Sequence, residues 1–169
     1  MADLLQIDKN HVNWSGVIMP CVVGRSGFSN DKYEGDGFTP TGKWKPLTVY
    51  YRADRVKVPK SNLPIIAINP NSGWSDDPKD SLYNQEISLP SKFSHEKLWR
   101  EDNLYDLFIT IDHNTNPVVK GRGSAIFIHQ MHESETPTAG CLALKFSDLE
   151  RLVSEITQDT CWIIGEHLA

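Results

Sequence analysis

Apolar and polar positions alternate along the chain over short stretches, a pattern typical of strands separated by turns. Stretches of this kind are rich in Val, Ile and Tyr and run over 16–23, 47–51, 55–58, 104–111 and 161–165. The second and third of them are close enough to form the two arms of a hairpin. A compact apolar run over 63–68 predicts a buried strand, and it leads into a long polar loop over 69–80.

Two segments show helical features. Ser94 can cap a short helix over 94–99. A capping box of Ser147 and Glu150 opens the second helix, and its apolar residues recur at i, i+3, i+4 and i+7: Leu149, Leu152, Val153 and Ile156. We therefore predict a mainly β protein with one or two short α-helices.

The segment 124–131 is apolar at both alternating sets of positions. Ala125 and Phe127 share the side of His129, whereas Ile126 and Ile128 belong to the opposite side. A strand that is buried on both faces lies inside a sheet rather than at its edge. This position would give His129 a rigid support.

The composition fits one domain over residues 1–169, long enough to form its own core. The net charge of −5 and the absence of a Lys/Arg run argue against nucleic acid as a partner. No apolar run approaches the ~18 residues of a membrane span, so no membrane association is expected. The first ten residues contain Asp3 and Asp8 and do not read as a secretory signal. We expect a cytoplasmic protein, or a periplasmic one if the sequence was trimmed.

The three cysteines, Cys21, Cys141 and Cys161, are widely spaced and odd in number, which fits reduced thiols. Cys21 and Cys161 stand in apolar surroundings and are expected to be buried. Cys141 differs because it follows the polar loop after His129. A free thiol has a pKa of about 8.5, and a neighbouring imidazole can take its proton. The amides of Gly140 and Cys141 would then form an oxyanion hole.

His129, followed by Thr138-Ala139-Gly140-Cys141, resembles the His…(Ser/Thr)-x-Gly-Cys signature of the L,D-transpeptidase catalytic domain, the YkuD-like family. The turn over 35–42 resembles the Gly-x-x-Thr-Pro-x-Gly turn of that family. Tyr105-Asp106, the run over 111–114 and the run over 121–127 resemble a short branch that carries the catalytic domain alone. The resemblance covers roughly 17–165. It implies a β-sandwich-like fold of mixed sheets, with the 35–42 turn packed under the catalytic face.

For the site, the resemblance implies Cys141 as nucleophile, His129 as base, and the backbone carbonyl of Gln130 as the group that fixes the imidazole tautomer. Thr138 would orient the loop or touch the substrate amide. The chain departs from many members at Ala143, where they carry Asn or Arg, so a substrate contact there is not expected.

Three further residues are candidates for substrate binding. Arg122 and Ser124 flank the histidine strand and could reach a substrate carboxylate, although an exposed arginine at a strand start is an equal alternative. Trp74 could line the cleft with Tyr83, with the acids beside it facing the amine of a diaminopimelate side chain. The favoured alternative is that Trp74 anchors its loop and the acids are solvated.

The resemblance implies a peptidoglycan stem peptide as substrate, cleaved at an L,D bond through an acyl-enzyme. Water as acceptor would make the protein an L,D-carboxypeptidase that releases D-alanine from soluble muropeptides, and this is the function that we predict because a cytoplasmic enzyme meets no polymerised wall. An amine as acceptor would make it an L,D-transpeptidase. Carbapenem-type inhibitors are candidate ligands, and no cofactor is expected.

Two other interpretations use the same residues. His129, His132, Glu133, Glu135 and Cys141 could form a zinc site, although the spacing of the histidines is not that of a helical metal motif and no second cysteine lies nearby. Alternatively, the chain could be a peptide-binding module that has kept the fold without the chemistry. The complete set of Cys, His and Thr-x-Gly argues against this.

Overall fold

The computed structural model describes residues 3–165 as a mainly β protein with mixed sheets and one α-helix. The strands are β1 (Leu4–Ile7), β2 (His11–Trp14), β3 (Val17–Val22), β4 (Gly27–Ser29), β5 (Phe38–Pro40), β6 (Gly42–Trp44), β7 (Pro46–Tyr51), β8 (Ile65–Ala67), β9 (Ser72–Ser75), β10 (Glu86–Ser88), β11 (His95–Lys97), β12 (Leu107–Ile111), β13 (Phe127–Gln130), β14 (Leu142–Leu144) and β15 (Cys161–Ile164). The helix is α1 (Phe146–Glu155). The predicted fold class is confirmed. No helix within residues 3–165 is long and apolar enough to cross a membrane.

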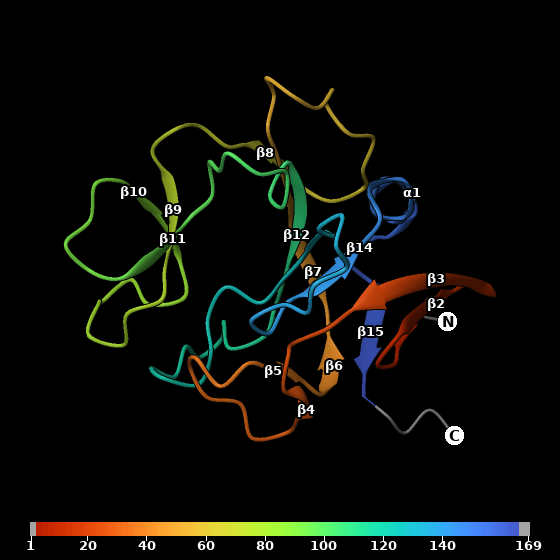
Figure 1. The fold of residues 1–169 in the computed structure, drawn as a ribbon, viewed down its shortest axis with the longest axis horizontal. Helices are drawn as coiled ribbons and strands as arrows, with labels where there is room; N and C mark the ends of the chain where they lie inside the picture. Colours follow the sequence, from red (N-terminus) through yellow and green to blue (C-terminus); the bar gives the residue numbers. More distant parts are fainter. Residues whose placement is uncertain (1–2, 166–169) are drawn as a thin grey trace.

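Ten strands form one large sheet in the order β6-β15-β1-β2-β3-β14-β13-β12-β7-β8. Near its middle, β13 pairs in parallel with β14 and antiparallel with β12. A three-stranded sheet, β10-β9-β11, and a two-stranded sheet, β4-β5, complete the fold. In Figure 1 the small sheet of β9 to β11 lies at one side of the molecule, and α1 lies with β2 and β3 toward the other.

The two faces of β13 contact two different cores. Ile128 faces the larger core, where the buried face of α1 packs against β12 and β13 through Leu149, Leu152 and Val153. Phe127 faces an aromatic core and contacts Phe108 at 4.8 Å between ring centroids. The prediction that this strand is buried on both faces is therefore correct. It also gives His129, on the side of Phe127, an aromatic support.

Two of the predicted elements are wrong. Residues 55–58 form no strand, so the hairpin is absent, and β7 pairs instead with β12 and β8. Residues 95–97 form β11 rather than a helix, because they hydrogen-bond as an antiparallel partner of β9. Pairing between strands that are distant in the sequence decides both cases. Neither the Val-rich run over 55–58 nor the serine at position 94 indicates which strand is available as a partner.

Loop and strand boundaries in the middle of the chain also differ from the prediction. The expected buried strand over 63–68 is reduced to β8 at the edge of the large sheet, where Ile65 and Ile66 are partly exposed. The expected loop over 69–80 contains β9, the central strand of the small sheet. This strand contains Gly73, and glycine has a low β-propensity, so the residue composition does not indicate a strand here.

The ends of the domain show two more differences. The N-cap of α1 is Lys145 without a side-chain hydrogen bond, so the expected capping box of Ser147 and Glu150 does not cap this helix. β1 and β2 were not predicted from the sequence, although Val12 and Trp14 are buried at alternate positions. Cys21 is buried as expected, whereas Cys161 is only half-buried.

We predict that Leu107→Ala lowers the free energy of unfolding by about 2–5 kcal/mol, because Leu107 is fully buried in the core under β12 and truncation leaves a cavity. Leu82→Ala is the matched control, since Leu82 is 47% exposed and its truncation is expected to cost within about 0.5 kcal/mol. Urea denaturation of both variants measures the difference. Equal losses for the two would contradict the placement of β12 in the core.

Candidate active site

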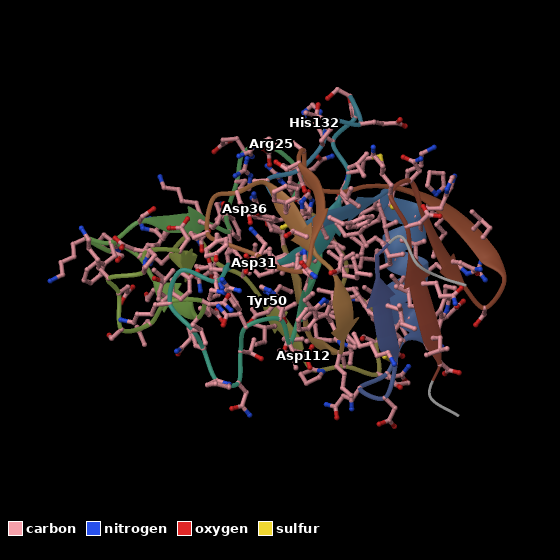
Figure 2. The ribbon with its side chains drawn as sticks, turned by 90° about the horizontal axis from the view of Figure 1, so that it is seen from below. Arg25, Asp31, Asp36, Tyr50, Asp112 and His132 are labelled. Carbon is pink, nitrogen blue, oxygen red and sulfur yellow. The ribbon has the colours of Figure 1, made fainter. Side chains whose placement is uncertain are left out.

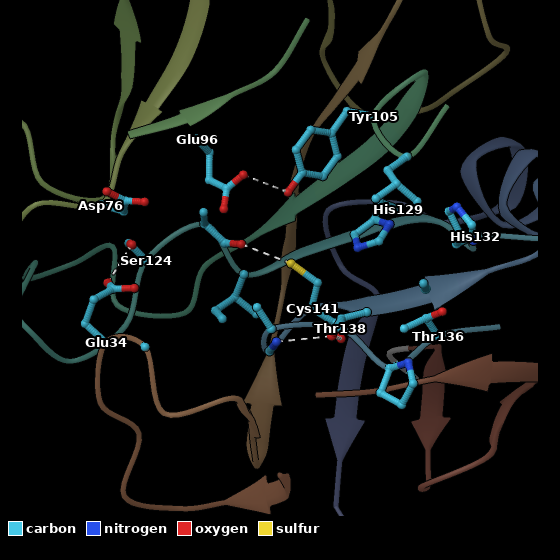
Figure 3. A pocket seen from close by; sticks show the side chains of 18 of the residues that line it. Glu34, Asp76, Glu96, Tyr105, Ser124, His129, His132, Thr136, Thr138 and Cys141 are labelled. Atoms are coloured by element: carbon cyan, nitrogen blue, oxygen red, sulfur yellow. Dashed lines mark hydrogen bonds between the residues drawn. The ribbon is translucent and has the colours of Figure 1, made fainter. Parts of the chain in front are cut away.

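A cavity of about 600 Å³ brings His129 and Cys141 together with the loop over 136–140 (Figure 3). Its far wall comes from the end of β9 and from β11, which contribute Asp76 and Glu96. The segment between β4 and β5 supplies part of the floor. Segments that are far apart in the sequence thus form a single concave site beside the large sheet.

The pairing of β13 with β14 determines how the two candidate catalytic side chains are placed. The Cα of His129 lies opposite that of Ala143 in the parallel ladder. Cys141 comes two residues before Ala143, so its side chain belongs to the same face of the sheet as the imidazole. Ala143 lines the cavity between them. Its small side chain leaves that face open.

His129 is held in one tautomer by the backbone. Its Nδ1 lies 2.7 Å from the carbonyl oxygen of Gln130. A carbonyl can only accept a hydrogen bond, so Nδ1 carries the proton and Nε2 is left to accept one. The ring also meets the edge of Tyr105, with centroids 5.4 Å apart. Burial lowers the pKa of His129 to about 4, which keeps the imidazole neutral at pH 7.

Cys141 is also neutral in this structure. Its Sγ donates to the carbonyl oxygen of Ala125 at 3.1 Å and accepts from the amide of Phe127 at 3.3 Å. Burial raises the pKa of the thiol to about 12. The resting site therefore holds a thiol and a neutral imidazole rather than a preformed thiolate and imidazolium.

Thr138 organises the turn before Cys141. Its hydroxyl donates to the carbonyl oxygen of Cys141 at 2.5 Å and accepts from the amide of Gly140 at 3.1 Å. The expected oxyanion hole is thereby changed, because the Gly140 N–H already has a partner within the turn. Of the two amides expected there, the Cys141 amide is the one that remains as a candidate donor.

The 35–42 turn packs directly under this loop. The Thr39 hydroxyl donates to the carbonyl oxygen of Gly140 at 2.9 Å and accepts from the amide of Gly24 at 2.8 Å. Gly140 has φ +145°, and a Cβ built on it would lie 2.9 Å from the carbonyl oxygen of Phe38. Only glycine fits at this position. The close approach of the protein backbone, and not only that of a substrate, therefore requires Gly140.

Three carboxylates line the end of the cavity away from His132 (Figure 3). Glu34 accepts from the hydroxyl of Ser124 at 2.6 Å and from that of Tyr83 at 2.5 Å. The pKa of Glu96 is raised by burial and then by the charge of Asp76. One carboxylate oxygen of Asp76 is buried without a hydrogen-bond partner among the described residues. This end of the cavity is electrostatically suited to a cation.

Two cationic side chains line the cavity, Lys32 and Arg100. Lys32 is buried, donates to the carbonyl oxygen of Tyr33 at 2.7 Å and is paired with Asp36. Arg100 is paired with Asp102. They lie on different parts of the wall, because Lys32 approaches Gly140 whereas Arg100 lies over the ring of Tyr105.

The structure brings together most of the residues expected from the sequence but leaves Gln130, Arg122 and Trp74 outside the lining of the cavity, although the Gln130 carbonyl holds His129. Cys141, His129, Gly140, Thr138 and Ser124 line the cavity. Arg122 does not; its guanidinium is paired with Asp31 at 2.7 Å and lies over the ring of Tyr33.

Trp74 lies behind the cavity wall. It is buried against Phe127, and its indole N–H donates to the side chain of Asn84 at 3.0 Å. These contacts are those expected if Trp74 anchors its loop, the interpretation favoured from the sequence. Its neighbour Asp76, however, does reach the cavity.

Among the lining residues that the sequence did not indicate as site residues are Lys32, Glu34, Glu96, Arg100 and Tyr105. Glu34 directly precedes the 35–42 turn, and Tyr105 belongs to the Tyr105-Asp106 motif. Their position next to or within motifs of the family was the only indication in the sequence that they could belong to the site. Glu96 lies in the segment for which a helix was predicted, and Arg100 directly follows that segment, so their orientation could not be inferred.

The residues of the alternative zinc site do not converge. Within residues 3–165, no three His, Cys, Asp or Glu side chains are grouped so that they could hold a metal ion. His132 is exposed on the loop after β13, at the outer edge of the molecule in Figure 2, and its Nδ1 lies 2.6 Å from the hydroxyl of Ser134. This loop forms the rim of the cavity.

One comparison with known proteins identifies the family of the domain. The model of the YkuD family, described as the L,D-transpeptidase catalytic domain, matches residues 4–164. No curated protein matches the chain in sequence. Among solved structures, that of Bd1075 from Bdellovibrio bacteriovorus aligns with a TM-score of 0.46 and 15% identity. The alignment covers 98% of this chain but 48% of that one, so the present chain spans about half its length.

We predict that iodoacetamide alkylates Cys141 slowly at pH 7 and ever faster up to pH 10. The thiol has a pKa of about 12, so its reactive thiolate fraction grows about tenfold for each pH unit below that value. Mass spectrometry of the digested protein measures the rate at this cysteine, with the half-buried Cys161 as an internal reference. A rate that reaches its plateau near pH 7 would instead reveal a preformed thiolate.

We also predict that Thr39→Val destabilises the protein and lowers turnover, because it leaves the Gly140 carbonyl and the Gly24 amide unpaired. Each buried group left without a partner costs about 1–3 kcal/mol. Thr39→Ser keeps the hydroxyl and is expected to retain most of the stability and turnover. Thermal unfolding and turnover of both variants check this, and a valine variant as stable as the wild type would refute it.

Proposed function

The chain belongs to the family of L,D-transpeptidase catalytic domains, whose members act on peptidoglycan peptides, and on this premise we propose that it is a cysteine-dependent L,D-peptidase of stem tetrapeptides. The bond cleaved joins the L-centred carbonyl of the third residue to a terminal D-alanine. The observation that carries the proposal is the cavity in which Cys141 and the Nε2-accepting tautomer of His129 face the same space.

In the proposed acylation step, the thiol proton of Cys141 passes to Nε2 of His129 as Sγ attacks the scissile carbonyl carbon. The negative charge on the carbonyl oxygen is stabilised by backbone N–H donors, of which the Cys141 amide is the candidate. When the tetrahedral adduct collapses, the C–N bond breaks and His129 gives its proton to the leaving amine. D-Alanine departs, and a thioester joins the tripeptide to Sγ.

Deacylation uses the same imidazole. His129 takes a proton from water while the water oxygen attacks the thioester carbonyl, and the C–S bond breaks as Sγ regains a proton. The tripeptide is released with a new carboxylate. An amine in place of water follows the same course and gives a cross-link or an exchanged D-amino acid, so the catalytic residues alone do not select the acceptor.

The charges of the cavity support a stem peptide as substrate. Glu34, Asp76 and Glu96 at one end suit the ammonium group of a diaminopimelate side chain, whereas His129 lies toward the other end (Figure 3). In this arrangement the acyl part of the substrate lies toward the carboxylates. The leaving D-alanine then lies on the His129 side of the thiol.

We favour water as the acceptor, which makes the protein an L,D-carboxypeptidase that acts on soluble muropeptides. We propose a cytoplasmic location, where soluble tetrapeptides returning from the wall are the substrates available. Trimming them to tripeptides would regenerate building blocks for the wall. Fractionation of the native protein tests the location on its own.

We predict that the purified protein converts a diaminopimelate-containing tetrapeptide to the tripeptide and free D-alanine, and that Cys141→Ala abolishes this conversion while the fold is retained. Mass spectrometry of the mixture with an excess of a free D-amino acid identifies the acceptor. Tripeptide shows that water is used, whereas a mass gain from the D-amino acid or a cross-linked dimer shows that an amine is used. Turnover by the alanine variant would remove the mechanism.

A further inference from the structure

The proposed reaction places a strong constraint on the leaving group. D-Alanine leaves as an amine that must take its proton from His129. Its carboxylate is attached to the same carbon as that amine, so the carboxylate oxygens lie only about 3 Å from the nitrogen. A negatively charged group therefore has to enter the cavity next to His129. Burying this charge is costly unless a cation pairs with it.

We propose that Arg100 is the residue that binds the carboxylate of the leaving D-amino acid and so makes the enzyme specific for a terminal residue. This inference rests on the proposed function and names the part of the substrate that the site recognises. Arg100 is the only arginine within residues 3–165 that lines the cavity.

Arg100 and His129 share a neighbour in the cavity wall. Both pack against Tyr105: the guanidinium carbon of Arg100 lies 5.4 Å from the ring centroid, and the imidazole centroid of His129 also lies 5.4 Å from it. The charge of Arg100 acts on His129, since it contributes to the lowered pKa of the imidazole after burial itself. The two groups are therefore near enough for the charge of Arg100 to act on the side of the site where His129 releases its proton.

The guanidinium of Arg100 is oriented by Asp102 and has further N–H donors that are not used in this contact. Its Nε and Nη2 donate to the two oxygens of Asp102 at 2.8 and 2.6 Å. A guanidinium has five N–H donors, and Nη1 has no acceptor among the described residues. Asp102 thus fixes the plane of the group while Nη1 and one N–H of Nη2 stay available for a second carboxylate.

The other cations do not meet this constraint. Arg122, the residue expected from the sequence, is paired with Asp31 outside the cavity. Lys32 lies toward Gly140 rather than toward His129, and its ammonium is engaged by Asp36 and by the backbone. Arg100 is the cation that a leaving D-amino acid would meet.

The same contact has a consequence for the acceptor. A free D-amino acid that attacks the thioester would approach along the path by which D-alanine leaves, so its carboxylate would bind Arg100 as well. Arg100 therefore governs both the release of D-alanine and exchange with a D-amino acid. Water needs no such contact, so hydrolysis of the thioester does not depend on it.

The test compares a diaminopimelate tetrapeptide that ends in a free carboxylate with its C-terminal carboxamide. The wild-type enzyme is expected to prefer the carboxylate. In Arg100→Gln, KM for the carboxylate peptide should rise by about 10- to 100-fold, the loss expected for a charge-assisted contact, while KM for the carboxamide changes little. Arg100→Lys keeps the positive charge but lacks the paired N–H donors of a guanidinium, so it should retain part of the affinity.

Three controls separate recognition from structure. Arg151→Gln removes an equivalent arginine that is paired with Glu155 on the surface of α1, and it should leave both KM values unchanged. Alkylation of Cys141 by iodoacetamide, which has no carboxylate, should proceed in Arg100→Gln at the wild-type rate. Arg122→Gln tests the competing residue directly.

The outcomes distinguish this inference from the proposed function. Equal loss of the carboxylate and the carboxamide peptide in Arg100→Gln, or a selective loss in Arg122→Gln in its place, would overturn the role of Arg100 while the L,D-peptidase activity stands. If the wild-type enzyme acylates Cys141 with neither peptide, the proposed function fails and this inference fails with it.

Discussion

The parallel pairing of β13 with β14 is the constraint on which the site depends. It places His129 opposite Ala143 and sets Cys141 two residues earlier on the same face. A slip of one residue would turn one of these side chains to the face covered by α1. Burial disfavours such a slip, because β12 is buried along its whole length and because Ile128, Leu142 and Leu144 belong to the larger core.

Burial explains the chemical state of the candidate catalytic pair. The aromatic core that supports His129 also removes water from it and from the thiol, so both groups are neutral at pH 7. The same dry environment strengthens every hydrogen bond that later stabilises developing charge. Backbone carbonyls replace the hydrogen bonds to water that these buried side chains lack. The Gln130 carbonyl accepts from the imidazole, and the Ala125 carbonyl accepts from the thiol.

The walls of the cavity are built by segments that the large sheet does not contain. The small sheet brings Asp76 and Glu96, and the segment before β5 brings Lys32 and Glu34. These charges are unevenly distributed around Cys141, with the carboxylates at one end and Arg100 beside the ring of Tyr105, against which His129 also packs. Such a distribution can orient a peptide that carries an ammonium in its acyl part and a carboxylate on its leaving group. Thr39 in β5 joins Gly24, which precedes β4, to Gly140 in the loop before Cys141.

The sequence by itself determined the class of the fold, the doubly buried strand that carries His129, and the pairing of a histidine with a Thr-x-Gly-Cys turn, because each of these is written in residues that are adjacent or regularly spaced. It did not determine the partners of the strands: the hairpin over 55–58 and the helix over 94–99 were predicted from local pattern alone and are absent. Only the tertiary structure shows that Arg122 lies outside the cavity and that Arg100 lines it. It also pairs the Gly140 amide with Thr138 and buries Cys141 and His129, which keeps both of them neutral. These properties arise from burial and from contacts between segments remote in sequence, which no local pattern encodes.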